Sequence, residues 1–384
     1  MLTTSLARAL LSGACAGALV LTLGTTPAGA GPNGSPQGIA ALAPKLPPPV
    51  LAQLEAAQVA RPTGTAAPTV PVDSRITEVN LPNRLSAPCG VEPGPDGALY
   101  INEMSAGKVG KYNPKDGSYR EITVGPPAAA VGVPRLIDGN MWTTDGVGSG
   151  LITSSVVKVD VATGKTTEWS LGLRPGSSAT DLTQGRDGRL YISNGGADTI
   201  TEFDPHAGRV VATYLVPGAL LGGSTIIQPG RGTALWTTSM LGNQIVKFDT
   251  ATKQFTLYPI PTAGSVPPIA VPTPDGKVWF VELIGDKIGY LNPDTGAIKE
   301  FPLPAGSKSA LDVEWNQQTG PDSAMIVADD VTGKIYQFDP NTEHWVREYP
   351  TPTPGSVPCA IGFQDGKAYV SELAGGNLAV IPDH

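Results

Sequence analysis

Residues 266–303 contain, in order, Val266-Pro-Pro-Ile-Ala-Val271, Asp275-Gly276, Lys277-Val-Trp-Phe-Val-Glu282, Lys287-Ile-Gly-Tyr-Leu-Asn-Pro293, Asp294-Thr-Gly296 and Ala297-Ile-Lys-Glu-Phe-Pro-Leu303. Four of these pieces are short apolar runs typical of β-strands, and we name them A to D in chain order. The Asp-Gly pair between A and B predicts a hairpin because glycine tolerates positive φ. The Asn-Pro-Asp-Thr-Gly sequence between C and D is a second turn signal. The segment therefore predicts one four-stranded antiparallel unit.

The A–B turn of this unit recurs along the chain. It is found at Asp96-Gly97, Asp138-Gly139, Asp187-Gly188, Arg231-Gly232, Asp275-Gly276, Asp322-Ser323 and Asp365-Gly366. The second residues of these turns are 42, 49, 44, 44, 47 and 43 residues apart. Seven four-stranded units at this period predict an all-β fold, a seven-bladed β-propeller. The high content of glycine (47 residues) and proline (38 residues) fits many short strands joined by tight turns.

The repeat begins and ends out of phase. Arg75-Ile-Thr-Glu-Val-Asn-Leu-Pro82 resembles a D strand with no A, B or C before it, whereas residues 358–382 contain A, B and C but no D. We therefore expect the N-terminal strand to complete the last blade. Such a closure removes the free sheet edges and joins the two ends of the ring.

The N-terminal region is expected to lie outside the propeller. The apolar run Leu10 to Leu23 and the small residues Ala28-Gly29-Ala30 predict a secretory signal peptide at residues 1–30. Residues 31–74 are rich in Pro, Ala and Gly and are interpreted as a leader, which leaves the propeller at residues 75–384. The protein is therefore expected in the secretory pathway or outside the cell, with no membrane anchor because the apolar run is too short. The net charge of −8 argues against nucleic acid as a partner.

Aligning the units predicts which residues meet at one mouth of the central channel, on the face that carries the B–C loops. The B strands end there in five carboxylates, Glu103, Asp145, Glu282, Asp329 and Glu372. These groups could hold a cation or raise one another's pKa values, or they could instead cap strand ends. An apolar rim that suits an organic ligand is expected from Cys89, Met104, Met240, Leu283, Leu311 and Leu373.

Further polar and sulfur-containing residues begin the A strands. Cys89 and Cys359 occupy equivalent positions in adjoining blades, so they could form a disulfide, remain buried thiols or supply a catalytic thiol. Asp181 and Asp312 could add to a metal site or bond to backbone. Arg135 could donate to a ligand carbonyl or pair with Asp145.

The unit resembles the streptogramin (virginiamycin B) lyase-like propellers over residues 75–384. The resemblance is carried by Asp275-Gly-Lys-Val-Trp-Phe-Val-Glu282, Gly285-Asp-Lys-Ile-Gly289, Pro293-Asp-Thr-Gly296 and Glu300-Phe-Pro-Leu-Pro304. It implies a site with a His after the strand-A Pro in the last two blades, a nearby Glu and magnesium, which opens a cyclic lactone by elimination. This chain has Leu311 and Cys359 at the histidine positions and Val357 at a glutamate position, and Glu372 alone matches an acidic one. The usual general base is thus missing from the expected mouth.

The chain is also similar, more loosely, to fungal propellers that act as hetero-Diels–Alderases in natural-product pathways. This similarity implies small apolar organic substrates and no cofactor. The two reactants would be a polyketide-derived quinone methide and a terpene alkene, which the enzyme joins. An apolar cavity that holds two reactants in near-attack geometry suffices for such a reaction. Our leading hypothesis is a cofactor-independent cyclase of this kind. Its polar contacts are expected from Glu103, Glu282, Glu372 and Arg135, and its apolar walls from the six rim residues.

Two alternatives remain open at this point. A metal-dependent lyase or lactone hydrolase would use the carboxylate ring with Mg or Ca. A non-catalytic secreted propeller would use the same face to bind a partner. Neither a phosphate-binding glycine loop nor a Cys/His metal cluster is present in the sequence.

Overall fold

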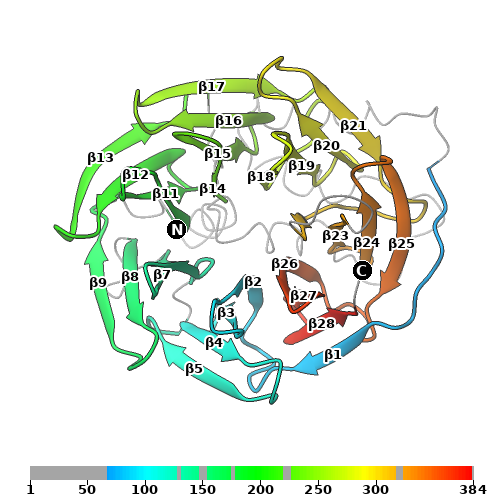
Figure 1. The fold of residues 1–384 in the computed structure, drawn as a ribbon, viewed down its shortest axis with the longest axis horizontal. Helices are drawn as coiled ribbons and strands as arrows, with labels where there is room; N and C mark the ends of the chain where they lie inside the picture. The colour runs from blue at the N-terminus through cyan, green and yellow to red at the C-terminus, as the bar shows by residue number, and fades with distance from the viewer. Residues whose placement is uncertain are drawn as a thin grey trace, which may run out of the picture.

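The computed structural model describes residues 67–127, 131–146, 154–173, 178–218, 226–316 and 323–382. Within these ranges the chain forms seven four-stranded antiparallel sheets, which are arranged as blades around a central axis (Figure 1). The described residues contain no helix, and so none that could span a membrane. The predicted all-β, seven-bladed propeller is confirmed. The expected signal peptide and Asp322 of the sixth turn lie outside the described residues.

Blades one to six each run from an innermost to an outermost strand in chain order. Blades one to three contain β2 (Pro88–Pro93), β3 (Leu99–Glu103), β4 (Lys108–Tyr112), β5 (Tyr119–Thr123); β6 (Arg135–Ile137), β7 (Asn140–Asp145), β8 (Ser155–Asp160), β9 (Thr166–Ser170); and β10 (Ala179–Gln184), β11 (Leu190–Asn194), β12 (Thr199–Asp204), β13 (Arg209–Leu215). Blades four to six contain β14 (Gln228–Pro229), β15 (Ala234–Ser239), β16 (Gln244–Asp249), β17 (Gln254–Pro259); β18 (Ala270–Pro272), β19 (Val278–Glu282), β20 (Lys287–Leu291), β21 (Ile298–Pro302); and β22 (Asp312–Trp315), β23 (Met325–Asp329), β24 (Lys334–Asp339), β25 (His344–Pro350).

The seventh blade is built from both ends of the described chain. It contains β26 (Pro358–Gln364), β27 (Lys367–Glu372), β28 (Asn377–Ile381) and, as its outer strand, β1 (Thr77–Asn80). β1 pairs antiparallel with β28, from Thr77 opposite Val380 to Asn80 opposite Asn377. In Figure 1 the blue β1 lies directly outside the red β28. The expected closure of the last blade by the N-terminal strand is therefore confirmed.

The A–B turns have the backbone that the Asp-Gly signal predicts. In the last blade both Asp365 (φ 50°) and Gly366 (φ 77°) are left-handed, as a two-residue hairpin turn requires. In every blade except blade six, which has Ile326, the strand that follows the turn carries an aromatic residue at the same position, packed into the core. These residues, each at most 4% exposed, are Tyr100, Trp142, Tyr191, Trp236, Trp279 and Tyr369.

Residues 67–74 lie outside the blades but pack against one of them. Val72 makes a parallel bridge to Glu348 of β25, and the amide of Asp73 donates to the Glu348 carbonyl over 2.8 Å. The amide of Glu348 donates in turn to the Pro71 carbonyl over 2.9 Å. This end of the expected leader thus covers the outer edge of blade six before the chain enters β1 (Figure 1).

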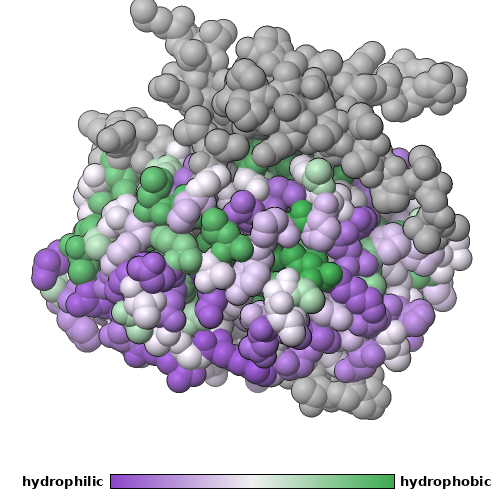
Figure 2. All heavy atoms as spheres, turned by 90° about the horizontal axis from the view of Figure 1, so that it is seen from above, coloured by the Kyte–Doolittle hydropathy of each residue, from purple (hydrophilic) through white to green (hydrophobic). Residues whose placement is uncertain are grey.

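The visible side of the disc is uneven in polarity. Figure 2 shows hydrophilic side chains along its lower rim and apolar patches above them.

Candidate functional site

The inner strands of the seven blades surround a central cavity of about 490 Å³. Every blade contributes lining residues from its inner strand or from the residues just beside it. A concave site of this volume at the axis of the fold falls in the range typical of small-molecule sites. The cavity is therefore the candidate functional site.

One level of the cavity wall carries most of its charge. Glu92 lies opposite Tyr100 in its blade, Arg135 opposite Trp142, and Glu314 of blade six opposite Ile326. Because Tyr100 and Trp142 are equivalent positions of the repeat, the register places Glu92 and Arg135 at the same depth. The equivalent residue of blade seven is Gly362, where an added Cβ would lie 2.8 Å from the Val91 carbonyl oxygen. The close approach of β26 to β2 thus requires glycine there.

Arg135 is held by two carboxylates of neighbouring blades. Its Nε and Nη2 donate to the two oxygens of Asp181 over 3.0 and 2.8 Å, and its Nη1 donates to Glu92 over 3.2 Å. Asp181 is fully buried, and the attraction of Asp181 and Glu92 for the guanidinium outweighs the effect of its burial, so the pKa of Arg135 is raised. The alternative pairing with Asp145 is wrong. Asp145 lies level with Val131 at the other end of the hairpin, whereas Arg135 lies beside the A–B turn.

Asp181 and Asp312 join each of their blades to the next. Asp181 accepts the amide N–H of Ile227 in blade four over 3.0 Å. Asp312 accepts the amide of Ile361 in blade seven over 3.0 Å, and also that of Val313 over 2.8 Å. Both aspartates therefore bond to backbone amides, which was one of the two interpretations that the sequence left open.

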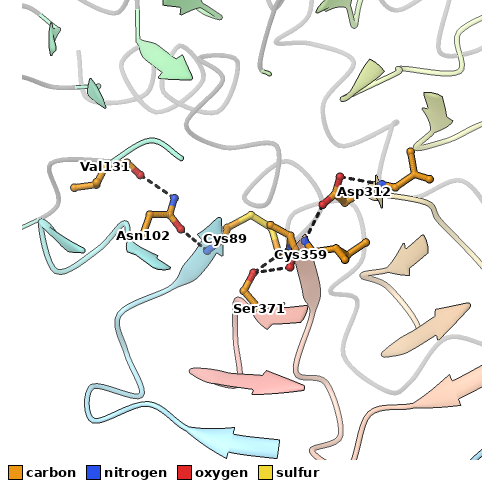
Figure 3. The surroundings of a disulfide bond; sticks show 9 residues. Cys89, Asn102, Val131, Asp312, Cys359 and Ser371 are labelled. Carbon is orange, nitrogen blue, oxygen red and sulfur yellow. Dashed lines mark hydrogen bonds between the residues drawn. A yellow bond between two sulfur atoms is a disulfide. The ribbon is translucent and has the colours of Figure 1, made fainter. Parts of the chain in front are cut away.

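A disulfide bond joins Cys89 of β2 to Cys359 of β26, with the two Cα atoms 5.2 Å apart (Figure 3). Both cysteines line the cavity. Asn102 accepts the amide N–H of Cys89 over 2.8 Å and donates to the Val131 carbonyl over 3.0 Å, so it links blade one to blade two. On the other side Ser371 accepts the amide of Ala360 over 3.0 Å. The disulfide is thus fixed between hydrogen bonds to both flanking strands.

The apolar rim gathers as expected. Met240, Leu283, Leu311, Leu373 and Cys359 belong to one buried cluster, and Cys89 and Met104 pack against it. Cys89, Met104 and Leu311 also line the cavity, whereas Met240, Leu283 and Leu373 are not among the residues lining it. The mouth is therefore apolar. All six rim residues belong to or pack against one cluster, and three of them also reach the cavity surface.

The B-strand carboxylates do not converge on the channel. Glu103, Asp145, Glu282, Asp329 and Glu372 are at most 1% exposed, and none of them lines the cavity. Glu103 accepts the Tyr119 hydroxyl over 2.7 Å, and Asp329 accepts Ser307 over 2.7 Å and the Lys308 amide over 2.9 Å. The expectation of a carboxylate ring at the mouth is thus wrong, because none of the five side chains reaches the channel, and Glu103 and Asp329 bond instead to an outer strand and to a loop.

Glu282 shows the physical reason most clearly. It lies beneath its own B–C turn, where a Cβ added to Gly285 would be 2.4 Å from a Glu282 oxygen. Burial, and then the charge of Glu300, raise the pKa of Glu282 to about 9. Burial, and then Glu78 of β1, raise the pKa of Glu372 to about 7. The polar contacts to a substrate that the sequence predicted for Glu103, Glu282 and Glu372 are therefore not available. Of the four polar residues predicted for the site, Arg135 alone lines the cavity.

The residues at the histidine and acidic positions that the resemblance implies do not fit a metal. Leu311 has no ligand atom, Cys359 is bonded to Cys89, and Glu372 lies beside another carboxyl group away from the cavity. In the ranges that the structure describes, no three His, Cys, Asp or Glu side chains are grouped so that they could hold a metal ion.

Sequence reasoning missed Glu92 and Glu314. Glu92 is the one charged residue of the inner strand Pro88–Pro93, and Glu314 follows Asp312 in the inner strand Asp312–Trp315. Both glutamates line the cavity. Burial, and then the charge of Asp312, raise the pKa of Glu314 to about 8, and burial raises that of Asp312 to about 7. Both glutamates could have been found from the sequence, because they occupy the same position of the repeat as Arg135.

Comparison with known proteins matches residues 170–383 to the model of the virginiamycin B lyase family. The virginiamycin B lyase of Nocardia farcinica is 25% identical over 217 residues, which are 56% of this chain and 70% of that protein. A streptogramin B lyase structure, 25% identical, superposes with a TM-score of 0.70 over 80% of this chain and 97% of its own. Catalytically inactive Staphylococcus aureus virginiamycin B lyase with quinupristin has a TM-score of 0.70 at 23% identity, over 80% of this chain and 98% of its own, which shows the fold alone. The family match covers more than half of the chain, and this chain therefore belongs to the virginiamycin B lyase family, which supports a lyase-type enzyme.

Proposed function

We propose that this protein is a lyase-type enzyme that acts on a small, mostly apolar organic molecule bound in the central channel. The observation that carries the proposal is the cavity of about 490 Å³, which combines an apolar mouth with a charged level deeper in the wall. Apolar walls with a few placed polar groups are typical of small-molecule sites. A disulfide at the mouth fits action in an oxidising compartment, which supports the proposed export.

The proposed reaction is the opening of a lactone ring by elimination, without the histidines of the family pattern. Leu311 and Cys359 at those positions cannot accept a proton, because one side chain is aliphatic and the other is in a disulfide. Of the described histidines, His206 and His344 are exposed and neither lines the cavity. We therefore assign the role of proton acceptor to one of the carboxyl groups on the channel wall.

The direct test is incubation of the purified protein with quinupristin, the ligand named for the Staphylococcus aureus structure. Elimination opens the ring with no change in mass, whereas hydrolysis adds the mass of one water, so mass spectrometry of the product separates the two reactions. We expect a ring-opened isomer, formed equally in EDTA. Loss of activity in EDTA and its return with Mg would favour the metal-dependent alternative, and no product from a panel of cyclic depsipeptides would contradict the proposal.

A second candidate is the cofactor-independent cycloaddition of hetero-Diels–Alder type. The specific observation in its favour is the apolar cluster, which brings together all six expected rim residues at one mouth. Such a reaction needs two reactants held in near-attack geometry and no proton transfer. A quinone methide precursor and a terpene alkene, incubated with the protein in EDTA, should give one enantiomer of the adduct by chiral chromatography. A racemic product at the uncatalysed rate would exclude this candidate for that pair of reactants.

A further inference from the structure

We propose that Glu314 is the proton-transfer residue of the channel and replaces the missing histidines as catalytic base. This inference rests on the proposed lyase function. It assigns the chemistry to blade six, which the sequence had linked to the site through Leu311, Asp312 and Asp329. Four steps of geometry and electrostatics lead to it.

The first step is the orientation of β22. Asp312 and Glu314 are two residues apart in this strand, so their side chains share one face, and both line the cavity. Val313 between them is fully buried in the core shared by blades five and six. The alternation of the strand thus directs Glu314 into the channel.

The second step is the rarity of carboxyl groups at this level. The equivalent residues of blades three, four, five and seven are Thr183, Gln228, Val271 and Gly362, which are opposite Tyr191, Trp236, Trp279 and Tyr369. None of these four side chains can act as a base at neutral pH. At this level the carboxyl groups are therefore Glu92 in blade one and Glu314 in blade six.

The third step separates Glu314 from its charged neighbours. Glu92 and Asp181 hold the Arg135 guanidinium. Asp312 accepts the amide of Val313 in its own strand and that of Ile361, which joins blade six to blade seven. A carboxylate engaged in this way must break these bonds before it can move toward a substrate, which costs stability. Glu314 lies on the same wall and is not tied by any of these interactions.

The fourth step is the electrostatic setting of the Glu314 side chain. It is influenced by Asp312 of its own strand, by Arg135 of β6 and by Glu92 of β2, while Gly362 of β26 and Val271 of β18 bring no charge. Burial, and then Asp312, raise the pKa of Glu314 to about 8, whereas Arg135 opposes the shift. A carboxyl group near this pKa exchanges protons at physiological pH, as a general base or acid must.

The step assigned to Glu314 is balanced without any co-reactant. Its carboxylate takes the proton from the carbon next to a carbonyl of the substrate. The electron pair of that C–H bond forms a C=C double bond, and the neighbouring C–O bond of the lactone breaks. The bond's electrons leave with the ring oxygen as a carboxylate, and Glu314 then returns its proton to solvent.

The experiment compares the kcat/KM of wild type, Glu314→Gln and the surface control Asp294→Asn on a ring-opening substrate between pH 5 and 9. Wild type should gain rate as pH rises, with an inflection near pH 8, because the basic form is the ionised one. Glu314→Gln should lose about 100-fold or more in kcat, with KM little changed, and should lose the inflection. Asp294, an exposed turn residue, should be replaceable without effect.

The possible outcomes separate the two proposals. If wild type leaves every lactone intact, the lyase function is overturned and the assignment of Glu314 falls with it. If wild type is active and Glu314→Gln keeps both the rate and the inflection, only the assignment of Glu314 falls. Should Glu314→Gln fail to fold by circular dichroism, Glu314→Asp decides: it should retain folding and part of the rate, with a displaced inflection, and an unchanged inflection would overturn the assignment.

Discussion

Arg135 and Asp181 illustrate how one buried pair fixes the channel wall. The Asp181 side chain is fully buried and that of Arg135 is 16% exposed, so removing the carboxylate leaves a cation without its main partner. Asp181→Ala should therefore lower the free energy of unfolding by about 3 kcal/mol or more, measured by urea denaturation. The control is Lys111→Ala, which breaks a pair with Asp96 in which the side chains are 29% and 40% exposed, and it should cost about 1 kcal/mol or less. Equal losses in the two variants would contradict the interpretation.

The raised pKa of Glu282 should make the free energy of unfolding fall as pH rises, whereas a carboxylate in an ion pair, whose pKa is lowered, loses its contribution as pH falls. The pKa of Glu282 is raised from 4.5 to about 9 in the fold, so the folded state binds a proton that the unfolded state has released between these values. Its contribution therefore favours folding at low pH and weakens, by about 1.4 kcal/mol per pH unit at most, as pH rises through that window. Glu282→Gln mimics the protonated group.

Chemical denaturation at pH 5 and pH 8.5 tests this prediction. Glu282→Gln should match wild type at pH 5 and exceed it at pH 8.5. The control Glu343→Gln removes a carboxylate whose pKa is lowered by Lys299, so it should not stabilise the protein at the higher pH. A Glu282→Gln variant that is less stable than wild type at pH 8.5 would show that the carboxylate is ionised in the fold.

At the scale of elements, the strands β2 and β26 are joined by the Cys89–Cys359 disulfide across 270 residues of sequence. Cross-linking so long a loop restricts the unfolded chain, so its loss should lower the free energy of unfolding by about 2–4 kcal/mol. Thermal unfolding with and without a phosphine reductant measures this difference. The Cys89→Ser/Cys359→Ser double variant should unfold at the temperature of the reduced wild type and should not respond to reductant. A melting temperature independent of reductant in wild type would contradict a stabilising role.

The strands also show what sequence could and could not predict. Turn chemistry at positions such as Asp365-Gly366 and the recurring aromatic residues indicated the number of blades and the core, because both depend on local sequence. The partner of Arg135 could not be found in this way. Its choice of Asp181 over Asp145 depends on depth within the channel and on contacts between blades, which the repeat alone does not give. For the same reason Glu282 appeared to belong to the mouth, although its side chain lies under a turn.

At the scale of the whole molecule, two different devices join the ends of the ring. The disulfide links the inner strands of blades one and seven, whereas β1 adds the outer strand of blade seven by pairing with β28. Residues 67–74 lie before β1 and cover the edge of blade six through Asp73 and Glu348. The two N-terminal contacts therefore protect the outer edges of two neighbouring blades, which would otherwise be open to pairing with another chain.

Three N-terminal truncations separate these contributions. A chain that begins at residue 67 keeps both contacts and should melt at the temperature of the full chain. A start at residue 75 removes the cover of β25 and should lower stability modestly, because few backbone hydrogen bonds are lost. A start at residue 81 also removes β1 and leaves the β28 edge unpaired, so it should melt far lower and form dimers or aggregates in size-exclusion chromatography. If the chain starting at 81 stayed monomeric and as stable as that starting at 75, the disulfide alone would suffice to close the ring, and β1 would be an accessory strand.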